Sequence, residues 1–164
     1  MKARICGVCL KSGMLCRTCR EAVEKGGVSE AEVRVSRLLF GLSDKVRNLK
    51  DITVKNVLET GGLLVIVCER GEAARMIGKS GNVVRRLEKE LGKRVSIVEE
   101  APDARQFIAG LLHPTPVVGV NVLYRGGGEM LKVMVGGGSA RLPLRDFREI
   151  IRRLYGKEVE IEES

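Results

Sequence analysis

The spacing of apolar residues predicts a regular order of helices and strands over residues 29–100. In chain order, the predicted elements are a helix over 29–42, a hairpin over 52–70, a helical turn over 72–77, a helix over 82–91 and a strand over 93–100. Ser29 and Glu32 have the spacing of a capping box at the start of the first helix. Gly61-Gly62 divides the hairpin, and the tetrapeptide GKSG divides the two later helices. The predicted order is therefore α-β-β-α-(GKSG)-α-β.

The same pattern returns in the second half of the chain. "NVLETGG" at 56–62 recurs as "NVLYRGG" at 121–127, and "LGKRVSIVEE" at 91–100 recurs as "YGKEVEIEES" at 155–164. The two offsets are nearly equal, and matching helices and strands lie between them. We infer an internal duplication in which each copy forms a three-stranded sheet with helices on one face. The copies differ where GKSG should return, because residues 142–145 read "LPLR".

Composition and charge narrow the classes of partner. The chain has 164 residues, 44% of them hydrophobic, so it can bury a core, and only 3% aromatic, so that core must be aliphatic. A net charge of +8 makes nucleic acid, acidic proteins and anionic membrane surfaces plausible partners. No apolar run approaches the ~20 residues of a membrane span, and the N-terminus lacks the features of a secretory signal. We therefore expect a cytoplasmic protein without a membrane partner, whose cysteines are metal ligands or buried thiols rather than disulfides.

Four of the five cysteines form a C-x2-C-x6-C-x2-C pattern near the N-terminus. They are Cys6, Cys9, Cys16 and Cys19. Two Cys-x-x-Cys pairs, each on a tight turn and joined by a short arm, can place four thiolates around one tetrahedral ion, a geometry that suits Zn²⁺. Two disulfides or a redox-active pair are the alternatives. We expect a structural zinc ion, since sulfur fills all four ligand positions, and we expect Cys68 to lie in the core.

The GKSG tetrapeptide could bind phosphate in two ways, as the end of a P-loop or as a turn between two helices. A nucleotide-binding P-loop reads G-x-x-x-x-G-K-[ST], but the required first glycine is Ala73 here, and the residues that follow it have helical character. In a helix-G-x-x-G-helix turn, the glycines permit a sharp bend and let phosphate approach the main chain beside a helix N-terminus. Lys79 would add a cation and Ser80 a hydrogen-bond donor. We predict this second arrangement, with no nucleotide cofactor; an ordinary capped corner between helices is the alternative.

The segment "MIGKSGNVVRRLEKELGKRVSIVEE" resembles the core of a KH domain, with its I-G-x-x-G signature. The tandem copy and the front segment "CGVCLKSGMLCRTCREAVEKG" resemble the archaeal NusA-like transcription factors. The resemblance implies an α+β protein with two fused type II KH-like units (α-β-β-α-α-β), the second degenerate, preceded by a small zinc knuckle. The implied domains are a four-cysteine knuckle over 1–27, a KH domain over 28–101 and a degenerate KH-like domain over 102–164.

The resemblance also implies that the protein binds single-stranded RNA and is not an enzyme. In KH domains the GXXG loop clamps about four nucleotides at their backbone. Carried over, that clamp is made of Gly78, Lys79, Ser80 and Gly81. Ile77 and Val84 would line the apolar groove for bases, and flanking contacts would come from Arg75, Asn82, Arg85 and Arg86. The second unit would extend the RNA path or merely buttress the first, and the arginines available for this are Arg141, Arg145, Arg148, Arg152 and Arg153.

The expected role is in transcription elongation, termination or antitermination. An adaptor that docks on RNA polymerase or the ribosome, with RNA binding secondary, is one alternative. A nucleotide-hydrolysing enzyme is the other.

Overall fold

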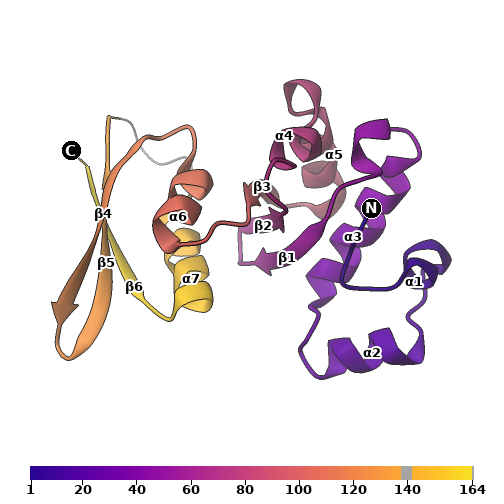
Figure 1. Ribbon diagram of the computed structural model, residues 1–164, viewed down its shortest axis with the longest axis horizontal. Coiled ribbons are helices and arrows are strands. Elements are labelled where there is room, and N and C mark those ends of the chain that lie inside the picture. The colour runs from indigo at the N-terminus through magenta and orange to yellow at the C-terminus, as the bar shows by residue number, and fades with distance from the viewer. Residues whose placement is uncertain (138–141, 164) are drawn as a thin grey trace. The chain divides into compact units, whose positions relative to one another are not determined.

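The computed structural model describes residues 1–137 and 142–163, which separate into two compact units (Figure 1). The first unit comprises Met1–Glu59 and Leu64–Glu100, and the second comprises Thr60–Leu63 and Ala101–Ser164. Arg141 lies outside the described residues. No helix within the two described ranges is long and apolar enough to cross a membrane. The cysteine segment lies inside the first compact unit, and the division of the chain at residues 27 and 101 stays a prediction.

From residue 29 onward, the first unit has the predicted order of helices and strands. Its helices are α1 (Gly7–Ser12), α2 (Arg17–Glu24), α3 (Glu30–Ser43), α4 (Ala73–Ile77) and α5 (Asn82–Leu91), with short 3-10 turns η1 (Arg47–Leu49) and η2 (Lys79–Gly81). Its strands are β1 (Val54–Glu59), β2 (Leu63–Cys68) and β3 (Arg94–Glu99). From α3 onward this order is α-β-β-α-α-β, as the sequence predicts. The α+β fold and its KH-like arrangement are therefore confirmed.

Local sequence explains where these elements begin and end. The Ser29 hydroxyl accepts a hydrogen bond from the Glu32 amide at 3.1 Å, and the Glu32 carboxylate accepts one from the Ser29 amide at 2.8 Å. This capping box satisfies two amides that the start of α3 would otherwise leave unpaired. Helix α5 ends at Gly92, whose φ of +66° is the left-handed conformation that favours glycine.

The core of the first unit lies between its sheet and three helices. The strand order is β1-β2-β3, with β1 antiparallel to the central strand β2. All six residues of β2 are buried, and Cys68 is among them, as predicted. Side chains from β2 pack in one cluster with residues of α3, α4 and α5, including Leu39, Met76 and Leu87. This packing fixes α4 and α5, the two helices that flank the GKSG turn.

The second unit repeats the sheet with fewer helices. Its elements are α6 (Ala104–Leu112), β4 (Val117–Arg125), β5 (Gly128–Val135), α7 (Leu144–Tyr155) and β6 (Glu158–Glu163). The strand order is β4-β5-β6; β4 and β5 are antiparallel across a two-glycine turn, and β5 and β6 are parallel. Helices α6 and α7 cover one face of the sheet (Figure 1). Between β5 and β6 the described residues form a single helix, which starts directly after Pro143, so the described part of this connection contains no helix-GXXG-helix turn.

Candidate nucleic-acid loop and candidate metal centre

The GKSG segment forms a sharp turn between α4 and α5. Helix α4 ends at Gly78, whose amide donates to the Ala74 carbonyl at 3.1 Å, and the Gly81 amide donates back to the Gly78 carbonyl at 3.0 Å. Gly78 has φ +77° and ψ 168°, a conformation that is essentially restricted to glycine. A Cβ at this position would also lie 2.6 Å from Cγ2 of Val83. The first glycine of the turn is therefore required by both backbone conformation and space.

The next two residues of the turn lie at the surface. Lys79 and Ser80 are exposed. Ser80 has φ +52°, and among the described residues it is the one non-glycine position with a positive φ. The Arg85 guanidinium donates to the Ser80 carbonyl at 2.6 Å and so ties the turn to α5. The turn is thus an exposed, fixed loop, and the two helices do not form one unbroken helix.

The loop leads directly into the positive end of a helix dipole. Gly81 is the N-cap of the ten-residue helix α5 and carries no side chain that could cap its first amides. Amides at a helix N-terminus, together with the helix dipole, favour a bound anion such as phosphate. Lys79 adds a full positive charge beside them. The segment before the loop is helix α4, whereas a nucleotide-binding P-loop follows a strand.

Only some of the predicted contact residues lie at the loop. Ile77 is the last residue of α4 and is 38% exposed, and Asn82 is the first residue of α5 and is also exposed. Val84 is half-buried and packs partly against the core, so only part of its side chain is available to a ligand. These residues, with Arg85, form the immediate surroundings of the loop.

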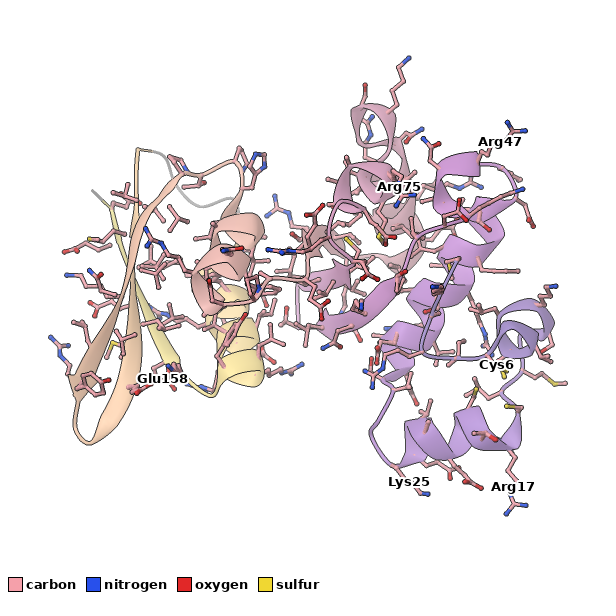
Figure 2. All side chains as sticks on the ribbon, in the orientation of Figure 1. Cys6, Arg17, Lys25, Arg47, Arg75 and Glu158 are labelled. Carbon is pink, nitrogen blue, oxygen red and sulfur yellow. The ribbon has the colours of Figure 1, made fainter. Side chains whose placement is uncertain are left out.

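Two predicted arginines have other neighbours. Arg75 on α4 donates to the Glu72 carboxylate at 3.3 Å; Figure 2 labels its side chain. Arg86 lines a hollow of about 230 Å³ between α3 and α5, together with Leu38 and Leu42. Their contact with RNA stays a prediction; Arg86 is exposed and lines this hollow from α5.

The different roles of the two loop glycines lead to a stability prediction. Gly81 has φ +73°, but a Cβ there would meet nothing within 4 Å. Gly81→Ala is therefore expected to cost about 1 kcal/mol, the usual penalty for a left-handed non-glycine residue. Gly78→Ala combines a glycine-only conformation with a steric clash, and we expect a loss of about 3 kcal/mol. Urea unfolding followed by circular dichroism would measure both; equal losses would contradict this assignment of roles.

The four predicted metal ligands lie together in the first unit. The Sγ atoms of Cys6, Cys9, Cys16 and Cys19 all lie within 4.8 Å of one another, and all four thiols are free. The Sγ of Cys6 is 3.4 Å from that of Cys9 and 4.0 Å from that of Cys16. Sulfurs that ligate one tetrahedral zinc ion are about 3.8 Å apart, given Zn–S bonds of about 2.3 Å. The donor set and its spacing therefore fit a four-coordinate metal site.

Two short helices present these sulfurs, where the sequence predicted tight turns. Cys6 is the N-cap of α1 and Cys16 the N-cap of α2, so each Cys-x-x-Cys pair occupies the first turn of a helix (Figure 2 labels Cys6). The Cys16 amide donates to the Cys9 sulfur at 3.0 Å, and the Cys6 amide donates to the Cys19 sulfur at 3.4 Å. Each helix start is thereby linked to a buried sulfur of the other helix.

The same contacts shift the pKa values of the thiols in opposite directions. Hydrogen bonds from the Cys9 amide and then the Cys9 thiol lower the pKa of Cys6 to about 7. The Cys16 amide favours the thiolate of Cys9, but burial and the surrounding thiols outweigh it and raise the pKa of Cys9 to about 12. Without a cation, then, the buried thiols keep their protons. A divalent ion would remove this barrier, because metal ligation deprotonates thiols.

Arg37 is a structural link to this cluster that the sequence did not reveal. Its Nε donates to the Cys9 carbonyl at 3.3 Å and so joins α3 to α1. Its Nη2 is buried and has no hydrogen-bond partner among the residues that the structure describes. The only hint in the sequence is an arginine between apolar positions of an amphipathic helix.

Part of this chain is similar in sequence to proteins named NusA. The chain is 38% identical over 88 residues to the "Probable transcription termination protein NusA" of Halobacterium salinarum, a match that covers 49% of this chain and 63% of that protein. It is 42% identical over 52 residues to the protein of the same name from Halococcus morrhuae, which covers 32% of this chain and 37% of that protein. The matches thus span less than two thirds of the length of these relatives.

Other comparisons address the fold. No protein-family model matches the chain. The crystal structure of APE1850 is similar with a TM-score of 0.55 and 22% sequence identity, over 77% of this chain and 96% of that chain. At this level of identity the similarity establishes the fold alone.

Proposed function

We propose that this protein binds single-stranded RNA through the loop Gly78–Gly81 and acts in transcription elongation, termination or antitermination. The observation that carries the proposal is the exposed glycine turn that leads into the uncapped N-terminus of α5, with Lys79 beside it. The net charge of +8 and the NusA relatives support it. RNA polymerase is the proposed site of action, since the relatives are named transcription termination proteins.

In this proposal the loop grips a phosphate and not a base. The first amides of α5 and the Lys79 ammonium would share one or two phosphate oxygens, while Ser80 could donate a further hydrogen bond. Ile77 would offer an apolar surface to a neighbouring base. Because aromatic residues make up only 3% of the chain, stacking can contribute little, and backbone contacts must supply most of the affinity.

The proposed role needs no chemical step. The surroundings of the loop contain cationic side chains, glycines and apolar side chains. We propose a binding protein without catalytic activity. The four cysteines would hold one structural zinc ion that fixes α1 and α2. Because all four ligand positions would be filled by sulfur, the ion would bind no water or substrate.

RNA binding is tested directly by fluorescence anisotropy with a labelled 20-nucleotide oligo(U) and a duplex of equal length. We expect tighter binding to the single strand, and an affinity for it that falls as salt rises, because phosphate contacts release counterions. A pull-down with purified RNA polymerase is the companion measurement. Polymerase capture without measurable RNA affinity at 50 mM salt would favour the protein-protein adaptor instead.

A further inference from the structure

Helix α7 of the second unit presents a stripe of exposed arginines. Arg145, Arg148 and Arg152 are spaced three and four residues apart, so they lie on one face of the helix. Together with Glu149 they line a shallow hollow on the surface of this unit. Asp146, the acidic residue in the first turn of α7, is buried and does not line the hollow.

The charge of this hollow is positive and largely uncompensated. Within residues 1–137 and 142–163, no carboxylate forms a salt bridge with Arg145 or Arg148. Arg152 pairs with Glu158 on β6, which Figure 2 labels. The one carboxylate of the hollow, Glu149, pairs with Arg153, which does not line it. Two guanidinium groups therefore remain available to a ligand.

The internal duplication shows what these arginines replace. With the offset of 64 positions, Gly81 of the loop corresponds to Arg145, and half-buried Val84 corresponds to Arg148. The alignment is supported by the core, because Leu87 and its counterpart Ile151 are both fully buried. The second unit thus has a guanidinium group where the first has a loop glycine, and another where the first has an apolar side chain.

We propose that Arg145 and Arg148, with Arg152, form a second contact for the phosphate backbone of RNA that needs no glycine loop. A guanidinium group can bind phosphate oxygens with two parallel hydrogen bonds, which a main-chain amide cannot do. An acidic protein segment is the other polyanion to consider. Protein interfaces, however, are centred on apolar or aromatic anchors, and the hollow is lined by three arginines and one glutamate. The choice of RNA as the polyanion rests on the proposed function, whereas the site itself rests on the arginines of α7.

The test compares Arg145→Gln/Arg148→Gln with the matched control Arg105→Gln/Arg125→Gln, which removes the same charge from exposed positions of the same unit. Anisotropy is measured with labelled oligo(U) of 20 and of 5 nucleotides between 50 and 300 mM NaCl. For the 20-mer we expect about tenfold weaker binding by the α7 variant. Its log–log salt slope should fall by about 1.4, since each single-strand phosphate contact contributes about 0.7. The 5-mer spans little more than the about four nucleotides of a GXXG clamp, so it should bind as before.

Two results would overturn the proposal. One is an α7 variant whose affinity and salt slope for the 20-mer equal those of the control. The other concerns polyglutamate, tested as a model of an acidic protein segment. If the α7 variant kept its RNA affinity but lost binding to polyglutamate, the hollow would be assigned to an acidic protein. A loop variant, Lys79→Asp/Ser80→Asp, separates the two proposals. If it binds RNA normally while the α7 variant does not, the loop proposal fails and the α7 contact stands; the reverse result removes only the α7 contact.

Discussion

Removal of the proposed zinc ion from the four-cysteine cluster is expected to unfold the segment that contains α1 and α2. These helices have only six and eight residues, too few for stability on their own. The helices pack around a small cluster of buried residues, and two of these are the metal-ligand candidates Cys9 and Cys19. A structural zinc ion contributes about 10–16 kcal/mol of apparent binding free energy at pH 7, which is as large as the whole stability of a typical domain.

The measurement combines metal analysis with hydrogen exchange. We expect one zinc per chain, and we expect a strong chelator to abolish amide protection in α1 and α2. Cys9→Ser should lose the metal and behave like the chelated protein. Cys68→Val, which changes the buried thiol outside the cluster, should keep one zinc per chain. Unchanged protection in the metal-free protein would show that the segment folds without an ion.

Features set by neighbouring residues were predictable from the sequence. The capping box of Ser29 and Glu32 depends on residues three positions apart, and the structure has both of its hydrogen bonds. The break at GKSG is also local, because glycine permits backbone conformations that other residues resist. The repeat offset placed both three-stranded sheets, since each copy carries the same alternation of strands and helices.

Features set by tertiary packing were not predictable. Arg86 was predicted to flank the loop, and that contact stays a prediction, but the sequence did not show that Arg86 lines a hollow between α3 and α5. Packing of α5 beside α3 then determines what Arg86 contacts. The contact between Arg37 and the Cys9 carbonyl joins residues 28 positions apart, and no local pattern encodes it. The same holds for the Glu99 carboxylate, which accepts a hydrogen bond from the Ala73 amide at the start of α4.

The second large effect is expected at the loop. Lys79→Asp/Ser80→Asp replaces the cation and places two carboxylates where a phosphate is proposed to bind, so attraction becomes repulsion. Both side chains are exposed, and aspartate tolerates the left-handed conformation of residue 80, so the fold should be preserved. We expect RNA affinity to fall about 100-fold or more at 100 mM salt, with a Tm within about 2 °C of wild type.

A matched control distinguishes a local effect from a change in total charge. Lys45→Asp/Asn48→Asp alters the net charge by the same amount at exposed positions of the same unit, after α3. If RNA binding reflected only the overall positive charge, the two variants would lose affinity equally. If the loop is the contact, the control should lose only a few-fold.

The most direct test of the loop is therefore one anisotropy titration of short oligo(U) against wild type, the loop variant and this control, with Tm measured on the same samples. We predict near-complete loss of binding in the loop variant, a small loss in the control and equal melting temperatures. Equal affinities for the loop variant and the control would contradict the central claim, because the glycine turn would then be only a corner between two helices.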